Sequence, residues 1–173
     1  MEENNGNPRL QQARYWKELT QLRAHIEYLQ LYSSRAEQFD NRLSIILAVT
    51  SSGSIAGWAI WSQAPFVWGM LIALSQLINA VRPYLPYQKQ KAALEGVVPS
   101  LEGLFLRAES DWFQVASGDV PNPQINDLLT KLKQQKLDLV QKHLQGVPLQ
   151  DLGELEEKAK ERARAYFKTA LSQ

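Results

Sequence analysis

Two apolar stretches separated by a short turn dominate the pattern of hydrophobic and polar positions along the chain. They cover residues 43–61 and 65–81, and no Asp, Glu, Lys or Arg falls between Arg42 and Arg82. At about 1.5 Å of rise per residue, a helix over the first stretch is roughly 28 Å long, which is close to the ~30 Å hydrocarbon thickness of a bilayer. The pattern predicts a transmembrane helical hairpin.

The residues at the ends of the hairpin predict its orientation. Trp and Phe gather near the turn, and aromatic residues also mark the opposite end, as they do at the two interfaces of a bilayer. Cations flank only the end away from the turn: Arg35, Arg42, Arg82, Lys89 and Lys91. Because Lys and Arg remain on the cytoplasmic side, both termini are predicted to be cytoplasmic.

A buried hairpin in a soluble helical bundle is the alternative. The polar run from Thr50 to Ser54 interrupts the first stretch, and the second stretch is short for a membrane span. A soluble hairpin would nonetheless carry charges on its outer face, and neither stretch has any. We therefore prefer the membrane interpretation.

The segments on both sides of the hairpin are predicted to be helical. Asn7 and Pro8 are typical of a helix start, and no Gly or Pro follows before Arg42, so one helix is predicted to run from Pro8 into the first apolar stretch. Its apolar positions recur at helical spacing: Trp16, Leu19, Leu22, Ile26, Leu29, Ala36 and Leu43.

Three amphipathic helices are predicted after the second apolar stretch. They begin near Gln88, at Asn122 and after Asp151, and no strand pattern or repeat is evident. The apolar stripe of the first of them is Leu94, Val97, Leu101, Leu104, Phe105, Ala108 and Trp112. The predicted fold is an all-α membrane protein in three parts: an N-terminal cytoplasmic helix (1–42), a transmembrane hairpin (43–82) and a cytoplasmic helical domain (83–173).

Composition and motifs give little sign of catalysis. The 173 residues include no Cys, which excludes disulfides and thiolate chemistry, and the net charge of +1 argues against a protein that coats nucleic acid. His25 and His143 have no Cys or acidic partner at metal-ligand spacing, so we expect surface or interhelical positions for them. No Walker, dinucleotide-binding or nucleophile-elbow motif is present. We predict no enzyme activity, no cofactor and no metal site.

The hairpin contains polar residues that a simple anchor does not need. Gln76 and Asn79 are three residues apart and share a helix face, and an amide in hydrocarbon is costly unless it finds a partner. Packing between helices and the lining of a water-filled pore explain them equally well, and both require neighbouring helices. A pore needs several copies of the chain. Its candidate lining residues are Ser51, Ser54, Ser75, Gln76 and Asn79.

Cations on the last two predicted helices have two interpretations. They are Lys131, Lys133, Lys136, Lys142, Arg162, Arg164 and Lys168. A solvated face is the simpler interpretation, since charge runs usually serve solubility. A site for an anionic ligand, such as nucleotide phosphates, is the sharper one. The sequence does not rank the individual cations.

This layout resembles the SLATT-type proteins, small bacterial two-span effectors found beside nucleotide-signal-producing enzymes in anti-phage defence systems. The resemblance covers the whole layout and rests on three parts: the helix Arg14 to Arg42, the hairpin Leu43 to Val81 and the helices from Gln88 onward. It implies a homo-oligomer in the bacterial inner membrane. A cyclic or oligomeric nucleotide made by a companion nucleotidyltransferase would switch it between closed and conducting states, so that infection depolarises the membrane.

The resemblance also suggests a role for each segment of the chain. The polar hairpin residues would line the pore, the elbow formed by Arg82, Pro83 and Pro86 would act in gating, and the soluble helices would serve assembly and ligand sensing. No ligand-binding residue is assigned. A passive two-span anchor whose cytoplasmic helices bind a protein partner is the alternative, and a soluble bundle for protein interaction is a third.

Overall fold

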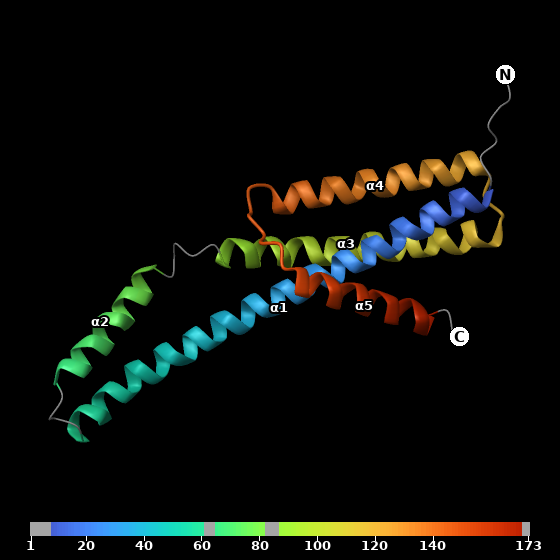
Figure 1. Ribbon diagram of the computed structural model, residues 1–173. Helices are drawn as coiled ribbons and strands as arrows, with labels where there is room; N and C mark the ends of the chain where they lie inside the picture. Colours follow the sequence, from blue (N-terminus) through green and yellow to red (C-terminus); the bar gives the residue numbers. More distant parts are fainter. Residues whose placement is uncertain (1–7, 61–64, 82–86, 171–173) are drawn as a thin grey trace. The chain divides into compact units, whose positions relative to one another are not determined.

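The computed structural model describes residues 8–60, 65–81 and 87–170, with the backbone alone for residues 8, 49–60, 65, 67–68, 71 and 87–88. All secondary structure in these ranges is helical (Figure 1). The helices are α1 (Pro8–Ile60), α2 (Pro65–Val81), α3 (Tyr87–Ser117), α4 (Asn122–Leu144) and α5 (Gly153–Ala170). The prediction of an all-α chain is confirmed.

The helices that contain the two apolar stretches follow the sequence pattern closely. α1 runs without interruption from Pro8 to Ile60, as the lack of Gly and Pro before Arg42 predicts. α2 covers the second stretch with Pro65 at its first position, where the missing amide hydrogen has no helical partner to lose.

Contacts divide the chain into two compact units. One consists of Met1–Tyr32 together with Ala92–Gln173, and the other of Ser33–Lys91. We call them the bundle and the hairpin segment. α1 and α3 each contribute to both units, so the boundaries between units fall inside helices and not in loops.

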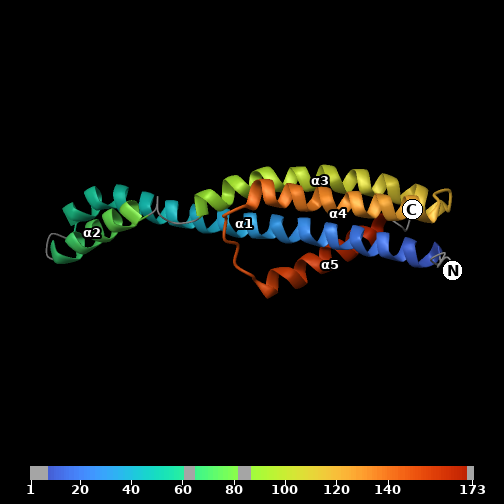
Figure 2. The same ribbon diagram turned by 90° about the horizontal axis from the view of Figure 1, so that it is seen from above.

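In the bundle, the first part of α1 runs antiparallel to α3, and α4 and α5 lie on opposite sides of this pair (Figures 1 and 2). Two hydrogen bonds hold α1 against the C-terminal half of α3. Gln12 Nε2 donates to the Val115 carbonyl at 2.9 Å, and the Tyr15 hydroxyl donates to the Ala108 carbonyl at 3.1 Å. Each satisfies a buried or half-buried polar group, which would otherwise be costly in this setting.

A seven-residue repeat builds the core of the bundle. Most of the buried residues of α1 and of α3 are separated by alternating steps of three and four, which is the spacing of helices that pack side by side at a small crossing angle. On α1 they are Tyr15, Leu19, Leu22, Ile26 and Leu29, and on α3 they are Leu94, Val97, Leu101, Leu104 and Ala108. Ile125, Leu129 and Leu132 of α4 complete this side of the core.

α5 is attached to the bundle by aromatic and ionic contacts. The ring of Phe167 packs edge-on against Trp16 with centroids 4.8 Å apart, and the Arg23 guanidinium lies 4.3 Å from the ring centre of Tyr166. The buried carboxylate of Glu27 pairs with Arg23 at 2.5 Å and with Arg162 of α5 at 3.8 Å. An unpaired charge at this depth would be strongly destabilising, so the two arginines make the position tolerable.

The predicted apolar stripes are largely confirmed, with one correction at the start of α1. Tyr15 is fully buried, whereas Trp16 is half-buried and packs at the edge of the core. Ala36 and Leu43, predicted on the same stripe, lie in the hairpin segment and are half-buried.

Gly96 marks the place where α4 comes close to α3. A Cβ at this position would lie 2.6 Å from Nδ1 of His143, whereas one at Gly103 of the same helix would have no atom within 4 Å. We expect Gly103→Ala to raise the free energy of unfolding by about 0.5–1 kcal/mol, because Ala is the better helix former. We expect Gly96→Ala to lower it by about 1 kcal/mol, because overpacking exceeds that gain. Chemical denaturation of the purified variants measures both.

Removing the imidazole is the matched control for this prediction. In a His143→Ala background, Gly96→Ala should become stabilising, as Gly103→Ala is. A stabilising Gly96→Ala in the unmodified chain would contradict the close approach of the two helices.

Candidate functional site

The hairpin segment has no core of its own in its described part. From Ser33 to Val81, no residue with a described side chain is buried. Figures 1 and 2 both show α2 beside the second part of α1. Between Leu43 and Val81, the half-buried residues with a described side chain form a narrow stripe on each helix: Leu43, Ser44 and Leu47 on α1, and Ser75 and Ile78 on α2. Only this inner side of the hairpin is shielded.

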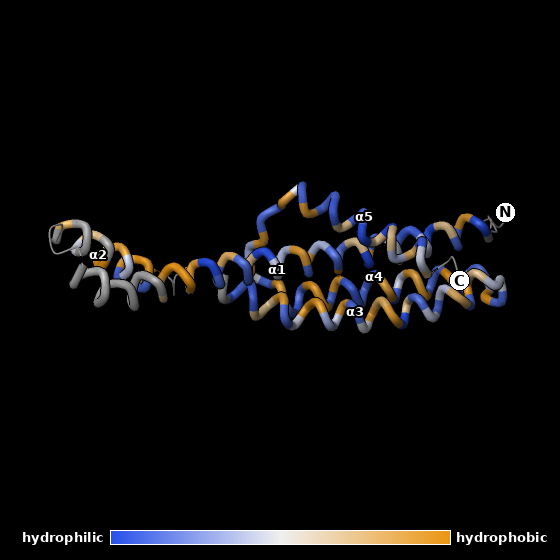
Figure 3. The backbone as a smooth tube through the Cα atoms, turned by 90° about the horizontal axis from the view of Figure 1, so that it is seen from below, coloured by the Kyte–Doolittle hydropathy of each residue, from blue (hydrophilic) through white to orange (hydrophobic). Residues whose placement is uncertain are grey.

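Large apolar side chains cover the outer side of the hairpin. Phe66 is 83% exposed, Met70 66% and Ile45 61%. Ile46, Ile72, Leu74, Leu77 and Val81 are exposed as well. Figure 3 shows α1 changing from hydrophilic residues to the hydrophobic ones that follow Arg42. A water-facing helix carries charges on its outer face, and this surface has none.

The predicted pore-lining residues of α2 differ in their surroundings. Gln76 and Asn79 are exposed, and Ser75 is half-buried. Packing inside the hairpin therefore does not account for the two amides. Ser51 and Ser54 lie on α1, where only the backbone is described, and the predicted elbow residues Arg82, Pro83 and Pro86 lie outside the described residues.

Within the described residues, no helix is both long enough and apolar enough to cross a membrane. The transmembrane hairpin, the cytoplasmic position of the termini and the division into residues 1–42, 43–82 and 83–173 stay predictions.

Ion pairs distinguish among the cations that the sequence left unranked. Lys133 and Lys136 lie 3.8 and 3.1 Å from the carboxylate of Glu18, and Arg162 pairs with Glu27. These three cations pair with acidic residues of α1 inside the bundle. For Arg164, no ion pair is present within the described part of the chain.

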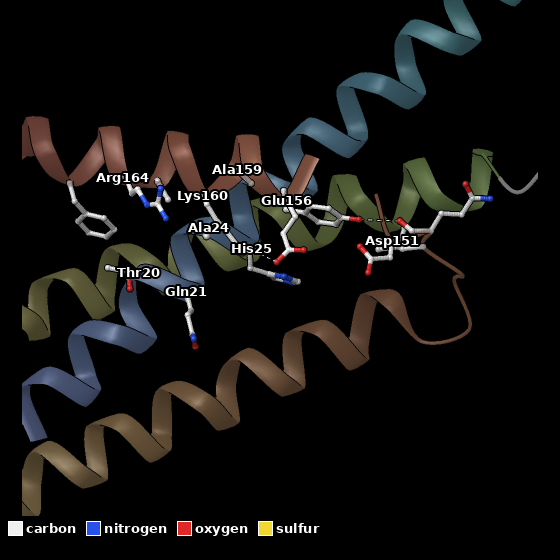
Figure 4. Close-up of a pocket in the computed structure, with 14 residues that line it drawn as sticks. Thr20, Gln21, Ala24, His25, Asp151, Glu156, Ala159, Lys160 and Arg164 are labelled. Carbon is white, nitrogen blue, oxygen red and sulfur yellow. Dashed lines mark hydrogen bonds and ion pairs between the residues drawn. The ribbon is translucent and has the colours of Figure 1, made fainter. Parts of the chain in front are cut away.

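Arg164 lines a pocket of about 740 Å³ on the bundle. α1 supplies one wall, and α5 with the connection that precedes it supplies the other (Figure 4). The small side chains of Ala24, Ala159 and Ala163 leave room between the helices, and the rings of Tyr28 and Phe167 add apolar surface. The Tyr28 hydroxyl donates to the Gln150 carbonyl at 3.0 Å, which ties the connection to α1.

The two ends of this pocket carry opposite charge. Asp151 and Glu156 lie at one end and Arg164 at the other (Figure 4). Lys160 lies between them, and its ammonium contacts Glu156 at 2.9 Å and Glu157 at 3.0 Å. Those hydrogen bonds raise the pKa of Lys160, and the two carboxylates balance its positive charge. Arg164 is therefore the cation of the pocket that remains available to a ligand.

His25 supplies a further polar atom at the pocket. Its Nε2 is buried and has no hydrogen-bond partner within the described residues. Burial lowers the pKa of His25 below its ordinary value of 6.5, and the positive charge of Lys136 lowers it further. The imidazole is thus neutral near pH 7.

Comparisons of the chain with protein-family models, with curated proteins and with solved structures give no match. Within the described residues, no three His, Cys, Asp or Glu side chains gather as metal ligands do. The resemblance to SLATT-type proteins and the absence of enzyme activity stay predictions.

The sequence predicted a surface or interhelical position for both histidines. The ring of His143 lies beside Gly96 of α3, and His25 lines the pocket, which the sequence did not indicate. The pocket joins α1 to residues far along the chain, and no local pattern signals that meeting. The one available signal was the run of alanines on α5 at steps of four, which marks a helix face that leaves space.

The shifted pKa of His25 predicts a pH dependence of stability. Between pH 6.5 and the lower pKa of the folded state, the unfolded chain binds more protons at this site than the folded chain does. The free energy of unfolding should therefore fall as the pH drops through this window, and His25 should contribute no such loss above it. His25→Gln should make the loss smaller, as measured by denaturation at about pH 7.5 and about pH 5.5.

The control is His143→Gln, which removes the other histidine of the chain and should leave the dependence in place. Equal pH dependence of the unmodified chain and His25→Gln would contradict a depressed pKa at His25.

Proposed function

We propose that the chain is a homo-oligomeric membrane effector whose hairpins form an ion-conducting pore, with both termini on the cytoplasmic side of a bacterial inner membrane. One observation carries this proposal. The described part of the hairpin segment exposes large apolar side chains, buries none of them and has no charge between Arg42 and Arg82.

The hydrophobic effect gives this observation its weight. Each Å² of apolar surface left in water costs about 25 cal/mol, and acyl chains remove that cost without needing specific partners. The 17 residues of α2 extend about 26 Å, somewhat less than the ~30 Å hydrocarbon core. Local thinning of the bilayer accommodates such a short span at a modest cost.

The exposed amides support several hairpins in contact over a single one. Gln76 and Asn79 have no shielded place inside their own hairpin, and an amide facing acyl chains loses its hydrogen bonds. In a ring of hairpins they would face neighbouring helices or pore water. Ser75, on the adjoining side of α2, extends the same polar strip.

The pocket between α1 and α5 supports control by an anionic ligand. Arg164 would bind a phosphate through two parallel hydrogen bonds, the apolar walls would hold a planar ring, and Asp151 would accept hydrogen bonds from amino groups of that ring. A nucleotide carries these three features. This agrees with the nucleotide-derived signal, abortive defence and membrane depolarisation that the resemblance to SLATT-type proteins implies.

A passive two-span anchor is the second candidate. The same apolar hairpin supports it, and it differs in giving Gln76 and Asn79 a packing role only. The two proposals separate on whether the purified protein conducts ions.

Ion flux through liposomes that contain the purified full chain tests the pore. The flux is measured with and without nucleotides and short oligonucleotides. We expect that one of these compounds switches the flux on or off. Replacing Gln76 and Asn79 together by Leu should lower the flux at least about tenfold, because hydrated ions lose their polar lining. The oligomer seen in detergent should persist.

The matched control exchanges two exposed apolar residues on the opposite side of α2, Leu74→Ile with Leu77→Ile. This change should leave the flux within about twofold, since it keeps the volume and polarity of the surface. Unchanged flux in the Gln76 and Asn79 variant would remove these residues from the pore. A silent oligomer under every condition would favour the anchor.

The ligand pocket makes a separate prediction. Arg164→Gln should raise at least about tenfold the nucleotide concentration needed to change the flux, because a charge-assisted contact of about 1.5–3 kcal/mol is lost. Lys158→Gln, which removes an exposed cation of α5 outside the pocket, should leave that concentration unchanged. The same response in both variants would place the ligand elsewhere.

A further inference from the structure

α3 carries a second stripe of regularly spaced positions, distinct from the one that faces the bundle core. All its members are exposed, and they follow one another in alternating steps of four and three: Pro99, Gly103, Leu106, Ser110, Phe113 and Ser117. Leu106 is 63% exposed and Phe113 68%, against 49% for the other large exposed apolar side chains described in the bundle, Leu10 and Leu137. The helix therefore has one heptad repeat for its own bundle and a second whose positions are exposed from Pro99 to Ser117. One heptad before Gly103, Gly96 already lies against His143 of α4.

This outer stripe alternates large and small residues. In heptad letters, the d positions carry Leu106 and Phe113 and the a positions carry Gly103 and Ser110. A Cβ added at Gly103 would meet no atom within 4 Å. Small a positions allow a second helix to approach closely, and the large d side chains then fill the space on both sides of the contact.

One flank of the stripe is acidic, and the other carries one cation between two uncharged polar residues, Ser100 and Gln114. The g positions are Glu95, Glu102 and Glu109, and the e positions include Arg107 and Gln114. In a parallel, in-register pair, each g residue faces the e residue five positions further along the other helix. Glu102 of one copy then faces Arg107 of the other. An antiparallel pair would instead bring the two rows of glutamates together.

Contacts inside the chain leave these groups ready for that pairing. The Glu102 carboxylate accepts a hydrogen bond from Gln30 at 2.6 Å, and Glu109 accepts one from the Tyr166 hydroxyl at 3.0 Å. Both carboxylates are held in place by these bonds and retain further acceptor sites. Arg107 is exposed and has no ion pair within the described residues.

We propose that this outer face of α3 binds the same face of a second copy of the chain, in a parallel two-stranded pair centred on Leu106 and Phe113. The pairing deepens the proposed homo-oligomer and rests on it. α3 begins six residues after α2 ends, so a parallel pair sets the attachment points of both hairpins at one end of the interface, where both hairpins can enter the same bilayer. The charge pattern makes the surface self-complementary in this orientation alone.

Cysteine cross-linking tests the pairing, because the chain has no cysteine of its own. Full-length protein with Leu106→Cys or Phe113→Cys is purified in detergent and oxidised mildly. Equivalent d positions of a parallel pair face each other within disulfide reach, so both variants should form disulfide-linked dimers. Leu137→Cys, on the exposed side of α4, should cross-link at least about tenfold more slowly, because its partner lies beyond that reach. Failure at either α3 position, or an equal rate for Leu137→Cys, overturns the proposal.

Charge reversal gives a second arm. Arg107→Glu should slow cross-linking of Phe113→Cys at least about tenfold, and adding Glu102→Arg should restore it by exchanging the two partners. A second variant combines Leu106→Glu with Phe113→Cys, which should also cross-link more slowly and leaves the contact of Glu102 with Gln30 unaltered. Thermal melting, followed by circular dichroism, checks that each variant folds. No slowing in a folded Leu106→Glu variant overturns the interface.

The outcome is independent of ion conduction. Liposomes that conduct while neither α3 position cross-links would reject this interface and leave the pore standing. Cross-linking at both positions in a protein that never conducts would support the interface and reject the pore.

Discussion

The segment from Leu43 to Val81 has no charge, and its described side chains form no core of their own. The proposed function depends on this constraint. Two helices that touch along one narrow stripe leave most of their apolar surface uncovered. Exposing Phe66, Met70 and Leu77 to water is unfavourable, so the segment needs surroundings that the chain does not supply. In the function we propose, acyl chains would cover the apolar residues, and neighbouring hairpins would supply partners for Gln76 and Asn79.

The bundle is built on the opposite principle. Its helices α1 and α3 carry heptad stripes that bury each other, and its charged residues are paired where they are shielded, as Glu27 is between Arg23 and Arg162. Small residues open space at chosen points: Gly96 admits the ring of His143, and the alanines of α5 leave the pocket beside Arg164. Residues of the helix α1 belong to both units.

Much of the fold could be predicted because the positions of Gly, Pro, charged and apolar residues along the chain determine where its helices lie. α2 begins at Pro65 and ends before Arg82, and α1 has no Gly or Pro between Pro8 and Arg42. The stripe from Leu94 to Ala108 follows from helical periodicity. The sequence pattern predicted Trp16 on the core stripe, whereas Tyr15 is the fully buried residue. Adjacent residues point about 100° apart on a helix, and only the neighbouring helices decide which of the two enters the core. The pocket was missed for the same reason, since its walls are distant in sequence and meet only through the packing of α5.

The account depends most on whether residues 43–81 cross a bilayer, and single cysteines in the cysteine-free chain test this directly. A membrane-impermeant thiol reagent is applied to intact cells and then to permeabilised ones. We expect labelling of Ser62→Cys in intact cells, labelling of Lys168→Cys only after permeabilisation, and protection of Leu74→Cys in both. Ready labelling of Leu74→Cys by the water-soluble reagent, or labelling of Ser62→Cys only after permeabilisation, would contradict a hairpin that spans the membrane.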